Sequence, residues 1–412
     1  MNRIKGGAVA LAILLSLCAC TGAPKQPGDS SSNEQPTVST QQIPTETLEK
    51  MPLHQGKWVE LSEGKKIYQG SGSFFDTFDT VVDLTFYTKD EETFKRLFEL
   101  AHQEFLRLHK LFDNYHEYPD VPSLMQINRL AVQAPIPVDP DLFHLLQLAL
   151  SNYEDCLGKV NIALGPVLSL WHDAREAAGV ESGPSQTSQD PSSTAPASGK
   201  AQLPDPEALQ EANRHTDIHK VVLNERDQTV YLADPDMALD LGAIAKGYAT
   251  ELVARKLMEK GLESGLISAG GNVRTVGRHP AGRDWRIGIE NPKTGSRDQA
   301  IASLPVPANA SVVTSGDYQR YFVVDGKRYN HIIDPKTLKP AVQYASTSIL
   351  TVDSGLADLL STAFFIADPQ EAQQIYQNYQ KKGIPIEVVW IDFQNKLSST
   401  AGLKDQLHLQ GE

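Results

Sequence analysis

Leu239-Asp240-Leu241-Gly242-Ala243-Ile244-Ala245-Lys246-Gly247-Tyr248-Ala249 is the stretch that decides the fold of this chain. It follows an alternating run at Val230–Leu232, which predicts a strand, and it leads through small residues into a helix. The apolar stripe of that helix is formed by Leu252, Val253 and Leu257. Gly261 stands where a C-terminal cap belongs, and a second strand is predicted at 265–269, before Gly270-Gly271-Asn272.

The turn at Gly242-Ala243 suits a phosphate group. Small residues at the start of a helix leave backbone N–H groups accessible, and the helix dipole makes that end electropositive. Lys246 adds a full positive charge in the first turn, and Asp240 can orient a ribose or ring group. Small residues alone would equally allow a helix and a strand to pack closely, so the two charged residues are what favour a binding site.

The first twenty residues have the features of an export signal. Arg3 and Lys5 form a basic start, and 8–17 form an apolar segment that is too short to span a bilayer. Leu17-Cys18-Ala19-Cys20 has the form of a lipoprotein cleavage site, which predicts removal of residues 1–19 and lipidation of Cys20. An ordinary cleaved signal peptide is the alternative. Two or more acyl chains would anchor the protein on the extracytoplasmic side of a bacterial cell membrane.

Composition divides the rest of the chain. Residues 20–56 are rich in Ser, Thr, Pro, Gln and Gly and predict a disordered tether, and 57–406 form the folded domain. Within that domain, 182–203 predict a disordered insertion. Loss of the two basic residues of the signal takes the formal net charge from −13 to −15, which argues against nucleic acid as a partner. Cys156 is then the only free thiol, so no disulfide is expected within the chain.

Periodicity predicts the other elements. Alternation from Phe78 to Tyr87 is typical of a half-buried strand, and Asp325-Gly326 predicts a hairpin turn. Helices are predicted at 91–112, 141–155, 355–366 and 370–382, and further strands at 285–289, 311–314, 346–352 and 386–391. His102, His109 and His116 recur every seven residues. That spacing is too wide for metal ligands on adjacent turns, so we interpret them as a solvated helix flank.

Two groups of residues are candidates for chemistry. Asp358 and Thr362 share one helix face with Ser361 beside them, and these oxygens suit Mg²⁺. The alternative is structural: an early Asp is favoured by the helix dipole, and a helical Thr can bond its own backbone. His331, ahead of Asp334-Pro335, is a candidate general base, although a single histidine more often has a structural role.

Taken together, these blocks resemble the ApbE-type flavin transferases, or FAD:protein FMN transferases, from about Phe74 to Ala372. The residues that carry the resemblance are Phe78-Asp79-Thr80, Asn161 to Trp171, Asp240 to Tyr248 with Ser268 to Gly271, Thr314 to Tyr318, His331 to Pro335, and Leu356 to Asp358 through Thr362. Asn161 and Ala163 stand where the family often has Asp and Thr, and Leu338 replaces the usual Gly after Pro-x-Thr.

The resemblance implies a role for each matching position. Residues around the FAD would be Phe78, Tyr115, Val160, Asn161, Asp240, Lys246 and Ile333. The Mg²⁺ site would consist of the Ala243 carbonyl with Asp358, Ser361 and Thr362. His331 would be the catalytic histidine.

The fold that the resemblance implies is a single α+β domain, with mixed and antiparallel sheets flanked by helices and FAD in a cleft. The implied reaction transfers FMN from FAD to a Thr or Ser hydroxyl of an extracytoplasmic acceptor flavoprotein and releases AMP, with Mg²⁺ as cofactor. Two alternatives remain open. One is a non-catalytic FAD-binding lipoprotein, and the other is a Mg²⁺-dependent FAD pyrophosphatase in which water replaces the acceptor.

Overall fold

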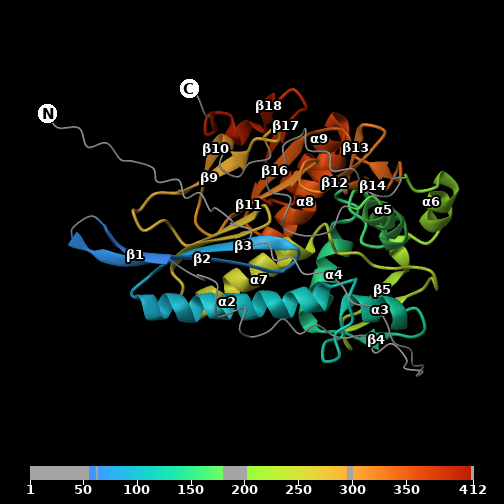
Figure 1. Ribbon diagram of the computed structural model, residues 1–412, viewed down its shortest axis with the longest axis horizontal. Coiled ribbons are helices and arrows are strands. Elements are labelled where there is room, and N and C mark those ends of the chain that lie inside the picture. The colour runs from blue at the N-terminus through green and yellow to red at the C-terminus, as the bar shows by residue number, and fades with distance from the viewer. Residues whose placement is uncertain (1–54, 62–63, 180–201, 295–299, 410–412) are drawn as a thin grey trace, which may run out of the picture. The chain divides into compact units, whose positions relative to one another are not determined.

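The computed structural model describes residues 55–61, 64–179, 202–294 and 300–409 (Figure 1). The predicted signal segment with Cys20, nearly all of the tether and residues 182–201 of the insertion lie outside these described residues. Among the described helices, none combines the length and apolar character needed to cross a bilayer.

One large sheet organises the fold. Its nine strands lie in the order β1-β2-β3-β7-β8-β11-β16-β17-β18, and each neighbouring pair is antiparallel. The strands are β1 Gln55–Glu60, β2 Lys66–Thr77, β3 Thr80–Thr88, β7 Ser264–Ala269, β8 Asn272–Val276, β11 Ser311–Gly316, β16 Ser346–Thr351, β17 Glu387–Ile391 and β18 Leu397–Ser399. The α+β class with antiparallel sheets flanked by helices is therefore confirmed.

Helices cover one face of this sheet. They are α2 Glu91–Phe112, α7 Ala245–Glu259, α8 Ser354–Ile366 and α9 Pro369–Lys381. The α2 helix begins at a capping side chain, because Asp90 accepts a hydrogen bond from the Thr93 N–H, and its apolar stripe enters the main core. In Figure 1 the yellow α7 and the blue α2 lie below the strands of the sheet. Helix α7 packs on β7 and β8, α8 packs on β8, β11 and β16, and the two helices pack on each other.

The opposite face of the sheet packs on a small second sheet. That sheet contains β9 Trp285–Glu290, β10 Ala300–Val306 and β19 His408–Leu409, in the order β19-β10-β9. Trp285 and Ile289 from this sheet form a second core with Val312 and Val389 from the large sheet. Strands β11 and β16 are thus buried on both faces, and burial of this kind fixes the register of a strand.

The remaining elements surround one end of the large sheet. The helices among them are α3 Leu124–Leu130, α4 Pro140–Asn152, α5 Gly165–Ala177, α6 Pro206–Asn213 and η3 Ile218–Lys220. The short η4, Ala401–Leu403, instead packs on β17 and adds Leu403 to the second core. The strands among them are β4 Ile136–Pro137, β5 Val221–Asn224, β6 Thr229–Leu232, β12 Tyr321–Val324, β13 Lys327–Asn330, β14 Ile333–Asp334 and β15 Lys339–Pro340. Trp171, Phe322, Ile333 and Leu338 form a separate cluster that joins α5 to these short strands.

Two sequence predictions are wrong. Phe78 and Asp79 do not belong to a strand: both have positive φ, 53° and 49°, and they form the turn between β2 and β3. The prediction of a solvated flank is wrong for His102, which is only 8% exposed and whose Nε2 lies 2.9 Å from an Asp76 carboxylate oxygen on β2. His109 is half-buried, and His116 is exposed but lies beyond the end of α2. Both errors arise from the pairing of β2 with β3, since β2 supplies contacts that the local pattern does not reveal.

Leu338 shows how the chain accommodates its departure from the family pattern. Its φ of 59° lies in the left-handed region that favours glycine. Its side chain is buried in the cluster with Trp171, whose Nε1 donates a 3.0 Å hydrogen bond to the Leu338 carbonyl. Burial of the leucine side chain thus offsets part of the backbone strain.

Candidate active site

A cavity of about 1020 Å³ lies where α5, the start of α7, one face of α8 and the short strands meet the end of the large sheet. Every candidate residue from the sequence lines this cavity except Ser361. Those residues are Phe78, Tyr115, Val160, Asn161, Asp240, Ala243, Lys246, His331, Ile333, Asp358 and Thr362.

The turn before α7 is held in place from both sides. Asp240 Oδ1 accepts a 2.8 Å hydrogen bond from the Gly242 N–H, and the Asp240 N–H donates to the Ile162 carbonyl. Asn128 bonds both the N–H and the carbonyl of Leu239 with its side-chain amide. Burial raises the pKa of Asp240 above its ordinary value. The turn is therefore rigid, and it presents the N-terminus of α7 and Lys246 to the cavity.

Helices α7 and α8 meet at Gly247 and Asp358. The Gly247 N–H donates a 2.8 Å hydrogen bond to Asp358 Oδ2, and Asp358 is 5% exposed. A Cβ atom on residue 247 would lie 2.2 Å from the Ser354 carbonyl oxygen, so only glycine fits. Gly247 is the third residue of α7, so its N–H is one of the first-turn donors that have no acceptor within the helix. Asp358 on α8 supplies that acceptor.

The oxygens at this junction fit a small divalent cation. A carboxylate from Asp358, a carbonyl from Ala243 and a hydroxyl from Thr362 are hard donors, of the kind that Mg²⁺ takes together with water or phosphate oxygens. Burial raises the pKa of Asp358, while the Lys246 charge opposes that rise. Burial disfavours the charged form of a carboxylate, and a bound cation stabilises that charged form.

Ser361, unlike the other proposed metal ligands, does not line the cavity. It is fully buried, its hydroxyl donates a 2.9 Å hydrogen bond to the Asp358 carbonyl, and its Oγ lies 2.7 Å from Ser315 Oγ on β11. Ser315 lies in the Thr314–Tyr318 block but was not predicted as a site residue, and it lines the cavity instead. Direct ligation by Ser361 stays a prediction.

His331 follows β13, and its side chain is open to the cavity. Its Nδ1 lies 3.1 Å from the Arg320 carbonyl oxygen. Because a carbonyl only accepts, Nδ1 carries the proton, and Nε2 of the neutral ring keeps a lone pair. Desolvation by the surrounding walls, together with the charges of Arg320, Lys246 and Arg175, lowers the pKa of His331 to about 3. The ring is therefore neutral at physiological pH.

The turn that carries Phe78 has a strained backbone and is held by hydrogen bonds from two other segments. Left-handed backbone at two successive residues with side chains is costly, on the order of 1–2 kcal/mol for each. The Phe78 N–H donates a 3.2 Å hydrogen bond to His109 Nδ1, and Arg320 Nη2 donates a 3.0 Å bond to the Asp79 carbonyl. These two contacts join the turn to α2 and to the segment that holds His331.

The other residues expected to contact FAD differ in whether their side chains are free to bind a ligand. Tyr115 is 52% exposed and stacks on His172, with ring centroids 4.7 Å apart. The Asn161 side chain is engaged within the protein, since Oδ1 accepts from the Ala163 N–H and Nδ2 donates to the Thr216 carbonyl. Val160 and Ile333 are buried and contribute apolar wall.

Sequence reasoning missed Arg175, Arg320 and His172, all of which line the cavity. Arg175 and Arg320 lie close enough to His331 to lower its pKa. Arg320 follows the Thr314–Tyr318 block that carries part of the resemblance, so its position was a usable signal. The positions of Arg175 and His172 on α5 depend on how that helix packs, which no local pattern indicated.

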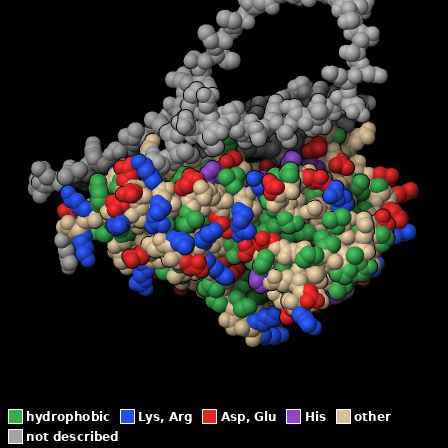
Figure 2. Space-filling model, turned by 90° about the horizontal axis from the view of Figure 1, so that it is seen from below, with side chains coloured by type: hydrophobic (Ala, Val, Ile, Leu, Met, Phe, Trp, Pro, Cys, Tyr) green, Lys and Arg blue, Asp and Glu red, His purple; other side chains and the backbone are tan. Residues whose placement is uncertain are grey.

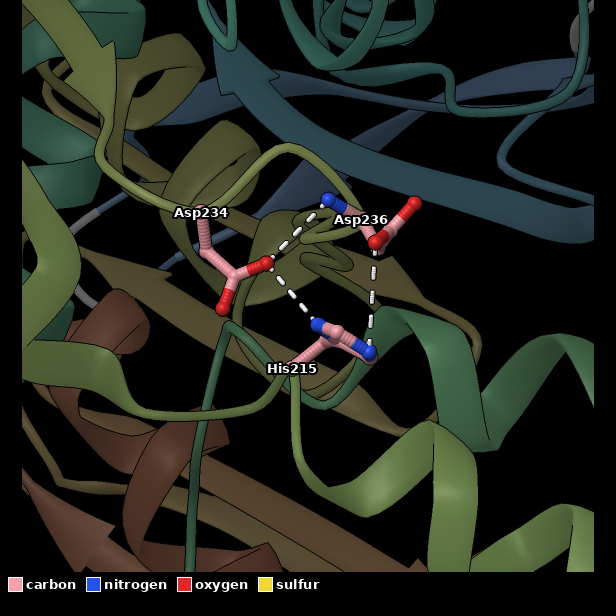
Figure 3. Close-up of side chains that lie close together, drawn as sticks. All are labelled: His215, Asp234 and Asp236. Carbon is pink, nitrogen blue, oxygen red and sulfur yellow. Dashed lines mark hydrogen bonds and ion pairs between the residues drawn. The ribbon is translucent and has the colours of Figure 1, made fainter.

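A second cluster of metal-ligand types lies elsewhere. Figure 3 shows His215 between Asp234 and Asp236, with His215 Nδ1 2.8 Å from Asp234 Oδ1. Lys220 Nζ donates a 2.7 Å hydrogen bond to the other oxygen of Asp234 and, with His215, lowers the pKa of Asp234 to about 2. The Asp236 N–H also donates to Asp234. Asp234 is thus already satisfied by protein donors, and we interpret the cluster as an ion-pair network.

Comparison with known proteins places these features in context. Residues 78–386 match the ApbE family. A FAD:protein FMN transferase of Treponema pallidum is 32% identical over 305 residues, which cover 70% of this chain and 76% of the relative. One from Klebsiella pneumoniae is 31% identical over 285 residues, which cover 68% and 78%. The crystal structure of the ApbE protein of Thermotoga maritima aligns with a TM-score of 0.67 and 25% identity, covering 82% of this chain and 99% of that one.

Proposed function

This chain belongs to the ApbE family, and on that premise we propose that it is a FAD:protein FMN transferase. It transfers the FMN part of FAD to a Thr or Ser hydroxyl of an acceptor flavoprotein and releases AMP, in a Mg²⁺-dependent reaction. The observation that carries the proposal is the shared cavity, which holds His331, the start of α7 with Lys246, and the oxygens of Asp358, Ala243 and Thr362. The names of the curated relatives support the same activity.

The start of α7 and Lys246 bind the pyrophosphate of FAD. Backbone N–H groups at a helix N-terminus and a lysine charge both favour an anion there. Mg²⁺, held by Asp358, Thr362 and the Ala243 carbonyl, would neutralise charge on the phosphates. Phe78 and Tyr115, with Val160 and Ile333, form the apolar and aromatic walls against which the flavin and adenine rings would pack.

His331 acts as the general base. Its Nε2 lone pair accepts the proton of the acceptor hydroxyl as the hydroxyl oxygen bonds to the FMN-side phosphorus. The bond from that phosphorus to the bridging oxygen breaks, and AMP leaves with the bridging oxygen. The anionic pyrophosphate offsets the cations around His331 and so raises the pKa of the ring toward the range of an effective base.

The location of the reaction is part of the proposal. Cys20 would carry a lipid anchor that holds the domain on the extracytoplasmic side of the membrane, where the acceptor is also found. The supporting observation is the Leu17-Cys18-Ala19-Cys20 sequence after a short apolar segment. The exposed face in Figure 2 carries interspersed acidic and basic side chains, which suits a protein partner better than nucleic acid.

One experiment separates this function from its two alternatives. The full chain is incubated with FAD, Mg²⁺ and a candidate acceptor domain, and the products are examined by denaturing gel and by nucleotide analysis. Fluorescent flavin that stays on the acceptor indicates transfer. Release of AMP and FMN without labelled acceptor indicates a pyrophosphatase, and FAD that is bound but unchanged indicates a binding protein. His331→Ala should abolish transfer while FAD still binds.

A further inference from the structure

Three hydroxyl groups link β11 to the ligand face of α8. Ser315 Oγ lies 2.7 Å from Ser361 Oγ and 3.4 Å from Thr362 Oγ1, and the Ser361 hydroxyl donates a 2.9 Å hydrogen bond to the Asp358 carbonyl. Ser361 is fully buried and Ser315 is 9% exposed. The groups thus form one continuous chain beneath the cavity, and it ends at a backbone carbonyl.

The donor and acceptor roles of the two serines follow from that end. A carbonyl only accepts, so the Ser361 hydroxyl donates its single proton to the Asp358 carbonyl. Ser361 Oγ must then accept the hydrogen bond from Ser315, whose hydroxyl donates. With its own proton engaged, Ser315 presents only lone pairs to Thr362 Oγ1 across the longer 3.4 Å contact, and a Thr362 proton directed at those lone pairs leaves the Thr362 lone pairs for the cavity.

We propose that Ser315 and Ser361 are positioning residues that orient the Thr362 hydroxyl so that its lone pairs face the cation site. This inference rests on the Mg²⁺ site of the proposed function. A hydroxyl whose proton points at a cation repels it, whereas one whose proton is held elsewhere can ligate. Ser361 contributes through this chain rather than by direct contact with the metal, consistent with its absence from the cavity wall.

The test measures binding of Mn²⁺ alone to the full-length protein, by electron paramagnetic resonance of free Mn²⁺ with Mg²⁺ as competitor. We expect Ser315→Ala and Ser361→Ala each to weaken binding roughly fivefold, the scale of one hydrogen bond. Because both act through one chain, the double variant should bind no more weakly than Ser315→Ala. Additive losses would mean that Ser361 ligates the metal directly, and wild-type affinity in Ser315→Ala would refute the chain.

A matched control addresses folding. Ser264→Ala removes another buried serine hydroxyl of the same sheet, which donates a 2.7 Å hydrogen bond to the Arg278 carbonyl away from the cavity. It should leave Mn²⁺ affinity unchanged, and a loss as large as that of Ser315→Ala would overturn the inference. Asp358→Asn should weaken Mn²⁺ binding far more than either serine variant, because it removes a charged ligand. If the wild-type protein itself fails to bind Mn²⁺, the metal part of the proposed function fails and the inference falls with it. If wild type binds but Ser315→Ala is unaffected, only the inference fails.

Discussion

The backbone N–H of Gly247 donates a 2.8 Å hydrogen bond to Oδ2 of Asp358 and so joins the first turn of α7 to α8. This bond places a buried carboxylate beside the electropositive end of a helix and gives an acceptor to a first-turn N–H that has none within α7. The phosphate-binding turn and the proposed metal ligands are therefore positioned by the same contact. A change at either residue should affect both functions.

Asp358→Asn tests the charge of the proposed metal ligand. The amide keeps the size of the side chain and an oxygen for Gly247, but it lacks the charge that attracts Mg²⁺. We expect transfer to fall by roughly two orders of magnitude at ordinary Mg²⁺ concentration. Partial recovery is expected with excess Mg²⁺ or with Mn²⁺, whose ligand preferences are similar.

The control for this prediction is His331→Ala, in which the missing function is proton removal. No metal concentration should restore its transfer activity, although FAD should remain bound. Rates of flavin transfer measured across a series of Mg²⁺ and Mn²⁺ concentrations compare the two variants. An unaltered Mg²⁺ dependence in Asp358→Asn would contradict the metal site.

Arg320→Gln should shift the pH dependence of transfer. After desolvation, the Arg320 charge is the largest cause that lowers the pKa of His331. Loss of a neighbouring positive charge favours the protonated ring, so the pKa of His331 rises. Since the base must be neutral, the acid limb of kcat/KM should move to higher pH.

The matched control is Arg328→Gln on β13, whose guanidinium stacks on Tyr321, 4.2 Å from the ring centroid. Arg328 is not among the groups that shift the His331 pKa. Its pH profile should keep the wild-type acid limb. The measurement is the pH dependence of kcat/KM for FAD at saturating acceptor. If the acid limb of Arg320→Gln stays at its wild-type pH, His331 is not the titrating base.

Gly247→Ala should destabilise the protein although it lies in a helix, where alanine is ordinarily favoured over glycine by about 1 kcal/mol. The added methyl group would lie 2.2 Å from the Ser354 carbonyl oxygen and 2.4 Å from Asp358 Cβ, so α7 and α8 must separate. We expect a loss of about 1–3 kcal/mol in the free energy of unfolding, together with weaker Mn²⁺ binding.

Gly288→Ala on β9 is the comparison for this prediction, because its methyl group would meet only the Ala300 Cβ, at 3.1 Å. It should leave Mn²⁺ binding at the wild-type level. Thermal unfolding and Mn²⁺ titration of both variants provide the measurements. Wild-type stability in Gly247→Ala would show that the two helices are less closely packed than described.

Cys20→Ala tests the proposed anchor, which lies outside the described residues. Without the lipidated cysteine the protein should leave the membrane fraction, because its tether is polar and carries no apolar segment of its own. Cys18→Ala should stay attached. Fractionation of cells that express each variant gives the answer, and membrane retention of Cys20→Ala would exclude lipidation at this position.

The sequence by itself determined the elements whose signals are local. The period of apolar residues and the Asp90 cap define α2, and Asp325-Gly326 forms the expected turn, with φ of 50° and 74°. Gly261 has the positive φ, 94°, that a helix C-terminus favours. The sequence also supplied the residues that gather around the cavity, because the resemblance to the family preserves their order along the chain.

The tertiary structure decided the contacts between segments that are distant in sequence. Pairing of β2 with β3 turns Phe78 and Asp79 into a strained turn and buries His102 against Asp76. Packing of α8 on β11 brings Ser315, which was not predicted as a site residue, to Ser361. The physical reason is that periodicity and caps depend on residues a few positions apart, whereas the partner of a buried polar group is set by which elements pack together.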